Sequence, residues 1–389
     1  MSFSNNDENA KTYITIALAL SSGFISSIGF GLLAPLFSLR MDDLGLSAGT
    51  IGILVTIAAS APLFLTPLIP RLLNIIPTKN ALFIAIIINM TLYCLLCINN
   101  SPFLWTIIRF CFSITGTFLF IASESWILEL APPKLRGRIF GFYAVIFYGG
   151  IGIGGLLISQ FTYKSNIVIY IAILLNLIVL PFFAIKTISA SKPHIGGQKF
   201  STTYKLIFKN LAIFMPAFAI GGLETAAFNL FPIWSRQIGF DDKMAGAILG
   251  AAAIGNIVLQ FPLGVLSDRI GRKNVLKLIA LVAIILPLIL ITTHNSIMVL
   301  AIICIWSGFV TGFYTMGLVG IAEYFEPQRI ALANAAFGTT YCIAQLIAPS
   351  FGGTLMQFYG SSALLISLSI IGILPLIMLY LPQKDEKYS

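Results

Sequence analysis

The chain has 389 residues, of which 58% are hydrophobic and only 10% are charged, and its mean hydropathy is +0.96. This composition leaves too little polar surface for a soluble globule, so it predicts an integral membrane protein. The formal net charge of +9 follows from the membrane topology described below, and it does not indicate nucleic-acid binding.

Hydrophobic runs recur along the whole chain and are separated by short polar turns. Each is at least about 17 residues long, which is enough to cross the hydrocarbon core of a bilayer. Backbone polar groups inside a bilayer need internal partners, so each run is expected to be a helix. The twelve expected helices span residues 13–39, 51–69, 81–98, 103–128, 139–161, 167–185, 211–234, 245–266, 275–292, 297–321, 331–358 and 363–381.

Basic residues are distributed unequally between the two sides of these helices. Twelve crossings place both termini on one side, and the turns of that side hold most of the 23 lysines and arginines. The positive-inside rule therefore predicts that both termini are cytoplasmic, in a bacterial inner membrane. The first dozen residues carry Asp7 and Glu8 and no basic cluster, so the first run is expected to remain as a helix rather than to be cleaved as a signal. The opposite turns hold Arg40, Lys164, Arg236 and Lys243.

The longest polar break, residues 186–210, divides six expected helices from six. It predicts a bundle at 1–190, a cytoplasmic linker at 191–209 and a second bundle at 210–389. The halves also share residues at one offset, 197 positions, which favours a repeat of six helices. The matching pairs are Pro35 and Pro232, Gly49 and Gly246, Gly141 and Gly338, Gly155 and Gly352, and Gln160 and Gln357.

A charged turn at 264–273, Gly-Val-Leu-Ser-Asp-Arg-Ile-Gly-Arg-Lys, lies between the eighth and ninth runs. Its glycines let two helix ends approach, and Asp268 is placed to bridge basic neighbours. The pattern G-x-L-S-D-R-x-G-R-K resembles the loop between the second and third helices of a six-helix repeat in the major facilitator superfamily. The resemblance covers essentially the whole chain. It implies an all-α integral membrane fold of twelve transmembrane helices in two pseudo-symmetric six-helix bundles.

The first half departs from this pattern, because the corresponding turn at 67–79 lacks the acid and the second glycine. Downstream, Arg109 followed by Gly116 resembles the R-x-x-x-G-type segment of the family. Glu124 and the pair Arg136 and Arg138 then close the fourth helix. This combination resembles bacterial YcaD-type carriers, whose substrates are poorly defined.

The glycine-rich run 150–155 in the fifth helix lacks the proline of the Gly-Pro-x-x-Gly-Gly pattern of antiporters, and the nearest match, at 348–353, lies in the eleventh helix. The run also matches G-x-G-x-x-G, but no strand precedes it, so it predicts close helix packing rather than a dinucleotide site. No G-x-x-x-x-G-K-[ST] occurs, which argues against a nucleotide-driven pump. Cys94 and Cys97 have metal-like spacing but no further ligand nearby. No enzyme activity, cofactor or metal is expected.

Three ionisable residues lie well within apolar runs, where a charge costs several kcal/mol. Glu224 lies near the middle of the seventh helix with no basic neighbour in sequence, so it is the candidate that carries a coupling proton; the alternative is a carboxyl held permanently by a hydrogen bond. Arg109 either extends to the outer surface or faces the cavity and holds an anionic group. Glu124 is expected to pair with Arg136 or Arg138.

In the resembling family the first, fourth, seventh and tenth helices line a central cavity, which implies candidate lining residues here. Core packing explains most aromatic stripes, but an aromatic wall with few charges favours an amphipathic organic solute. The candidates are Ser22, Ser26, Ser27, Arg109, Ser113, Thr117, Phe228, Phe231, Trp306, Phe309, Phe313 and Tyr314.

The charged residues at the cytoplasmic ends of the helices are expected to form a gate. Asp268 should accept hydrogen bonds from Arg269, Arg272 or the start of the eleventh helix, and Glu323 should join this cluster. The predicted gating network comprises Asp268, Arg269, Arg272, Lys273, Glu323, Glu124, Arg136 and Arg138.

The sequence thus predicts a monomeric secondary active transporter that is coupled to protons and interacts with a small-molecule substrate and membrane lipid, without nucleic acid. Uptake and efflux both remain open. The alternative is a membrane sensor or partner-binding protein that keeps the fold without transport, which the eroded first-half turn favours mildly.

Overall fold

The computed structural model describes residues 2–66, 68–98, 101–130, 136–184, 200–326 and 329–380, and within these ranges the chain is almost entirely helical and contains no strand. The first half comprises α1 (Ser2–Asp43), α2 (Ala48–Ala59), α3 (Ala61–Leu65), α4 (Ile69–Ile75), α5 (Thr78–Ile98), α6 (Pro102–Leu130), α7 (Arg136–Phe161) and α8 (Ile167–Val179) with the 3-10 turn Leu180–Ala184. The second half comprises α9 (Phe200–Lys209), α10 (Leu211–Gln237), α11 (Asp242–Ile270), α12 (Arg272–Leu290), α13 (Ser296–Tyr324), α14 (Ile330–Tyr359) and α15 (Ser362–Met378).

These helices confirm the predicted fold class. Ten helical segments in the described ranges are long and apolar enough to cross a membrane, and α14 and α15 occupy the positions of the eleventh and twelfth predicted spans. The second span is divided at Ser60 into α2 and α3, because Pro62 has no backbone N–H to continue the helix. The linker region was not predicted to be helical, but α9 forms there and buries Ile207 against Phe214.

Polar residues at the turns fix where several helices begin. The Ser47 side chain accepts a hydrogen bond from the backbone N–H of Thr50 at the start of α2, and Asp241 does the same for Met244 at the start of α11. Such caps satisfy backbone donors that a helix start leaves without partners. Gly271 separates α11 from α12 with a φ of 84°, which is a backbone conformation that favours glycine.

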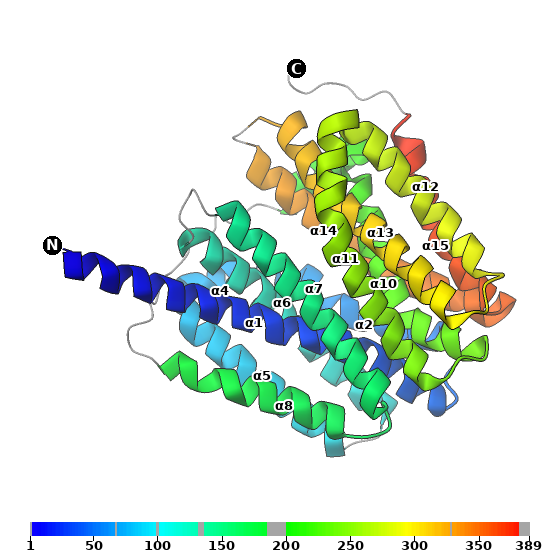
Figure 1. Cartoon of the computed structure of the whole chain (residues 1–389), viewed down its shortest axis with the longest axis horizontal. Helices are drawn as coiled ribbons and strands as arrows, with labels where there is room; N and C mark the ends of the chain where they lie inside the picture. The colour runs from blue at the N-terminus through cyan, green and yellow to red at the C-terminus, as the bar shows by residue number, and fades with distance from the viewer. Residues whose placement is uncertain are drawn as a thin grey trace.

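The two halves meet along two helix pairs, α7 with α11 and α2 with α14 (Figure 1). Glycines make both contacts close. A Cβ atom on Gly246 of α11 would clash with the carbonyl oxygen of Gly155 on α7, and one on Gly353 of α14 would clash with the backbone of Ala48 on α2. The expectation that the run 150–155 permits close helix packing is therefore confirmed.

The two contacts are related by the 197-residue offset seen in the sequence. Gly49 on α2 packs against Gln357 on α14, and Gly246, which is 197 residues later than Gly49, packs against the equivalent helix α7 of the first half. Equivalent helices thus make equivalent contacts across the interface, as a pseudo-symmetric pair of bundles requires.

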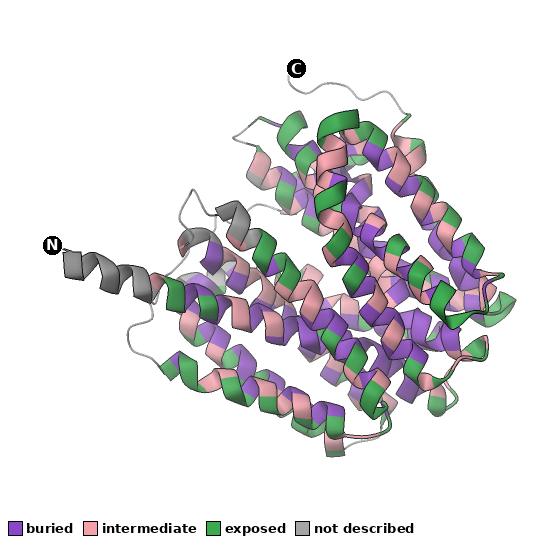
Figure 2. Ribbon diagram, in the orientation of Figure 1, coloured by how far each residue is buried: buried purple, intermediate pink, exposed green. Residues whose placement is uncertain are grey.

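Buried residues concentrate inside each bundle and where the bundles meet, whereas exposed residues cover the outside (Figure 2). Much of this outer surface is apolar: Phe103 is 76% exposed and Phe261 is 79% exposed. Large exposed apolar surfaces of this kind suit contact with lipid, in agreement with a multi-pass integral membrane protein.

Candidate functional site

A cavity of about 1740 Å³ lies between the two bundles. Its lining comes from α1, α2, α3, α6 and α7 on one side and mainly from α10, α13 and α14 on the other. It reaches Thr66 beyond the end of α3 and Asn334 in the first turns of α14, and we call this end of the bundles the open end. The opposite end, where α1 and α10 finish and α11 begins, is the closed end.

An ion-pair network joins the bundles at the closed end. The Nη1 atom of Arg236 at the end of α10 lies 2.6 Å from Asp42 Oδ2 and 3.0 Å from Asp43 Oδ1 at the end of α1. Its Nη2 atom lies 2.8 Å from Asp242 Oδ1 and donates to the Tyr163 hydroxyl at 2.6 Å. Burial and the hydrogen bond to Asp43 raise the pKa of Tyr163, so its protonated hydroxyl donates to Asp43 Oδ2 at 2.6 Å.

Glu224 lies in the cavity wall on α10, and its Oε2 atom accepts a hydrogen bond of 2.9 Å from the Tyr341 hydroxyl on α14. Gly221, one turn earlier, allows this contact, because a Cβ atom there would clash with the carbonyl oxygen of Tyr341. Within the described part of the chain no lysine, arginine or histidine forms an ion pair with Glu224. Its only hydrogen-bond partner there is a neutral phenol.

Arg109 on α6 points inward rather than to the outer surface, so the expectation that it extends to that surface does not hold. Its Nη2 atom donates to Asn229 Oδ1 on α10, and its guanidinium carbon lies 5.4 Å from the centre of the Phe37 ring. The Nη1 atom is buried and has no hydrogen-bond partner among the described residues. This side chain bridges the bundles between the cavity and the closed end.

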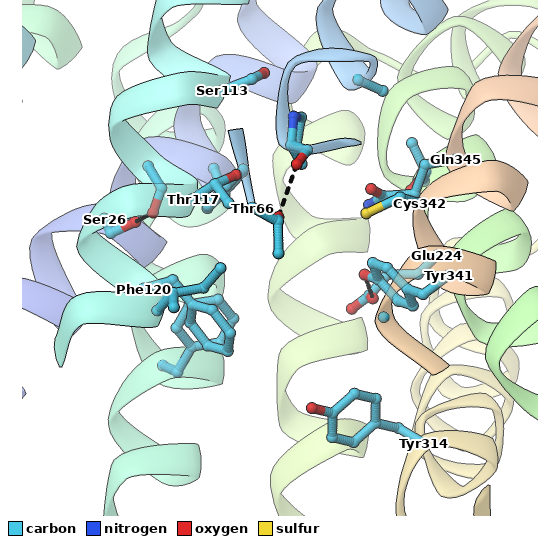
Figure 3. A pocket seen from close by; sticks show the side chains of 18 of the residues that line it. Ser26, Thr66, Ser113, Thr117, Phe120, Glu224, Tyr314, Tyr341, Cys342 and Gln345 are labelled. Atoms are coloured by element: carbon cyan, nitrogen blue, oxygen red, sulfur yellow. Dashed lines mark hydrogen bonds between the residues drawn. The ribbon is translucent and has the colours of Figure 1, made fainter. Parts of the chain in front are cut away.

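The predicted cavity residues divide into two groups. Ser26, Ser113, Thr117, Phe228 and Tyr314 line the cavity. Figure 3 shows Ser26, Ser113, Thr117 and Phe120 on one side of the open space, and Glu224, Tyr314, Tyr341, Cys342 and Gln345 on the other.

The rest of the predicted aromatic stripe on α13 does not line the cavity, which corrects its expected position. Trp306 is buried, donates its ring N–H to the carbonyl oxygen of Ala283 on α12, and packs against Phe231. Phe313 is fully buried in the same core, and Phe309 packs against that core. The face of α13 that carries Trp306 lies toward α12 and α10, and another face carries the lining residues Thr311, Tyr314, Thr315 and Leu318. Ser22, Ser27 and Phe231 are also buried outside the cavity lining.

Most of the interactions predicted for the gate at the open end are not formed among the described residues. Arg272 Nε donates to Glu323 Oε2 at 2.8 Å, but this pair joins α12 to α13 within one bundle. Asp268, Arg269 and Lys273 are exposed and form no hydrogen bond or ion pair in the described ranges. No described residue of the first bundle forms a hydrogen bond or an ion pair with these three side chains. The side chains of Arg136 and Arg138 lie outside the described residues.

Glu124 lines the cavity, and its predicted pairing with Arg136 or Arg138 involves side chains that lie outside the described residues. Sequence reasoning also missed Asn229, Tyr341 and Gln345. A usable signal was present on α14, where the polar or small residues that line the cavity recur at spacings of four, three and four: Asn334, Gly338, Tyr341 and Gln345.

Two helical membrane bundles that enclose a solute-sized cavity, closed at one end, define a membrane transporter. The chain belongs to the Major Facilitator Superfamily, whose family model matches residues 19–246 and 213–389. It is 25% identical to the uncharacterized MFS-type transporter YfkF of Bacillus subtilis over 357 residues, 90% of each chain. It is also 25% identical to the uncharacterized MFS-type transporter YcaD of Escherichia fergusonii over 277 residues, 71% of each chain. The predicted resemblance is confirmed.

Solved structures show the same fold. The nucleoside transporter NupG superposes with a TM-score of 0.73 at 16% identity, covering 96% of this chain and all (100%) of that one. A bacterial homolog of the human lysosomal transporter Spinster, in an inward-facing and unoccupied conformation, superposes with a TM-score of 0.69 at 13% identity, covering 95% of this chain and 94% of that one.

Proposed function

We propose that the chain is a secondary active transporter that moves a small amphipathic organic solute across a bacterial inner membrane by alternating access. Both termini are on the cytoplasmic side, so the open end faces the cytoplasm. The bundles 1–190 and 210–389 rock about the cavity, with 191–209 as the linker. A cavity that reaches one end of the bundles and is closed at the other supports this proposal.

The transporter couples solute movement to protons through Glu224. The observation that carries this assignment is its position: a carboxyl in the cavity wall, held by the Tyr341 phenol and without a cationic partner among the described residues. A buried carboxylate without a countercharge is costly, and a bound proton removes that cost. The carboxyl therefore exchanges a proton when the cavity changes the side to which it opens.

Alternating access also needs a gate at each end. The network around Arg236 holds the closed end in the present conformation. When that end opens, the turn between α11 and α12 approaches the first bundle, and Asp268 then gains cationic or helix-terminal partners beyond those that the described residues provide here. Asp268 therefore acts as a gate residue in this second conformation.

The test uses purified protein in sealed proteoliposomes with an imposed pH difference and a panel of amphipathic solutes selected by thermal shift. The wild-type protein should accumulate a solute against its gradient. Glu224→Gln keeps the shape and the hydrogen bond to Tyr341 but cannot titrate, so it should bind and exchange solute without concentrating it. Glu326→Gln, an exposed acid outside the cavity lining, is the matched control.

If Glu224→Gln accumulates solute as the wild type does, the proton is carried elsewhere. If the wild type drives no solute-dependent flux with any solute that it binds, the protein is a non-transporting sensor with the same fold.

A further inference from the structure

Two carboxyl groups face the same cavity from opposite bundles, and neither forms an ion pair with a described cationic residue. Glu224 comes from α10 and Glu124 from α6. In the described part of the chain, Glu224 is bonded only to a phenol and Glu124 forms no hydrogen bond or ion pair. The only basic residue in the described lining is Arg109.

Aromatic rings line the same cavity as these carboxyls. On the first bundle, the Phe120 ring lies 5.0 Å from that of Phe147 and 6.0 Å from that of Tyr143, centre to centre. On the second bundle, Tyr314 packs edge-on against Phe337 at 5.5 Å. All five residues line the cavity.

Rings and carboxyls occupy one section of the cavity. Tyr314 lines the cavity together with Glu124 and Glu224. Figure 3 shows Phe120 facing Glu224, Tyr314 and Tyr341 across the open space. We call this set, Glu124, Glu224, Phe120, Tyr143, Tyr314 and Tyr341, the carboxyl–aromatic section.

Arg109 lies at a different depth along the helices, nearer the closed end. It is bonded to Asn229, which lies five residues beyond Glu224 on α10, roughly 7.5 Å along the helix toward the closed end. Its guanidinium is also placed over the Phe37 ring. The positive charge of Arg109 therefore lies outside the carboxyl–aromatic section. This section has a net negative charge when its acids are ionised.

This chemistry favours a positively charged solute over a negatively charged one. Ring faces attract organic cations through the negative face of the π system, and a carboxylate adds a direct countercharge. In a site shielded from water, an unpaired carboxylate gains much from a cation, and an anion placed between two carboxylates is repelled.

We infer that the carboxyl–aromatic section binds an amphipathic organic cation, an ammonium or phosphonium centre with an aromatic body, in exchange for a proton on Glu224. The inference rests on the proposed function and specifies its substrate class. In the exchange the protonated carboxyl releases its proton to water and the resulting carboxylate pairs with the cation, so charge is conserved and no bond in the solute breaks. Tyr341 on α14 donates a hydrogen bond to Glu224, and Tyr148 on α7, Tyr314 on α13 and Arg109 on α6 line the same cavity.

Two permanently charged probes of matched shape test this inference: tetraphenylphosphonium and tetraphenylborate. Binding to the purified full-length protein in detergent is measured by calorimetry, and proton release is followed with an indicator in weak buffer. The phosphonium should bind and release about one proton per bound cation at a pH at which the site is protonated. The borate should show no binding above the detergent background.

Variants locate the site. Glu224→Gln should abolish proton release and weaken phosphonium binding about tenfold, and Glu124→Gln should weaken binding less. Glu326→Gln, exposed and away from the cavity, should match the wild type. Size-exclusion profiles establish that each variant is folded, and the wild-type proton release provides a readout that needs no variant.

Borate binding without phosphonium binding would show an anion site at Arg109 and overturn the inference, while transport of an anionic solute would still stand. Phosphonium binding that is the same in Glu224→Gln and Glu326→Gln, or that releases no proton, would also overturn it. Because binding is measured at equilibrium, these outcomes are separate from the vesicle experiment that tests transport itself.

Discussion

The closed end and the open end of the bundle interface use charge differently. At the closed end Arg236 is bonded to acids on both bundles, within contacts that glycines make close. At the open end the turn between α11 and α12 carries more basic residues, but its one ion pair among the described residues, Arg272 with Glu323, stays within a single bundle.

The difference shows that charge density at a helix end does not reveal which contacts a given conformation makes. An ion pair between bundles stabilises only the conformation in which it forms, whereas a pair within one bundle is kept in both. The closed-end network therefore stabilises the present conformation. The ion pair at the open end does not stabilise either conformation relative to the other. Four substitutions test this comparison.

The largest effect is expected from Gly246→Leu, which places a side chain against the backbone of Gly155. Overpacking here should separate α7 from α11, cost about 3 kcal/mol and abolish transport. Melting temperature and vesicle transport are the measurements. Gly141→Leu is the control, because a Cβ atom there meets nothing within 4 Å. An equal loss in both variants would contradict a specific role of the closed-end contact.

Arg236→Gln should have the next largest effect, since it leaves Asp42, Asp43 and Asp242 without their shared cation. A loss of about 2 kcal/mol corresponds to roughly a thirtyfold shift toward opening of this end. A membrane-impermeant maleimide should then label Ser113→Cys, in a cysteine-free background, from the outer side. The exposed Lys243→Gln should leave labelling unchanged. Unaltered labelling in Arg236→Gln would show that the glycine contacts alone hold this end.

Asp268→Asn should slow transport several-fold and leave thermal stability within about 0.5 kcal/mol, because the carboxylate is exposed and forms no ion pair with a described residue. Expression and melting temperature should be those of the wild type. Transport rates that also equal those of the wild type would remove Asp268 from the gate.

The smallest effect is expected from Glu323→Gln. Its carboxylate is 57% exposed at its ion pair with Arg272, so the loss should be within about 1 kcal/mol. Because both partners belong to one bundle, transport should change little. A double-mutant cycle with Arg272→Gln measures the coupling, and a transport defect as large as that of Asp268→Asn would place Glu323 in the gate.

The sequence predicted the helices and the two-bundle fold well, because these depend on local composition. Runs of apolar residues need internally bonded backbones in lipid, and a lone acid in such a run is evident without coordinates. The 197-residue offset predicted a repeat, and the contacts of Gly49 and Gly246 are related by that same offset.

The lining of the cavity was less predictable. On α13 the aromatic residues are spaced for a single face, but only Tyr314 reaches the cavity, and Trp306 and Phe313 pack into the core. Helical periodicity shows which residues share a face but not what that face meets.

The sequence by itself thus determined a twelve-helix membrane protein of two related bundles, with a carboxyl placed inside the membrane. Only the tertiary structure decided that Arg109 points inward to Asn229, that Glu124 and Glu224 face one cavity, and that Arg236 closes one end. The physical reason is the separation along the chain over which each effect acts. Hydropathy acts on neighbouring residues, whereas these pairings join side chains a hundred or more positions apart, and they exist only once the two bundles have packed.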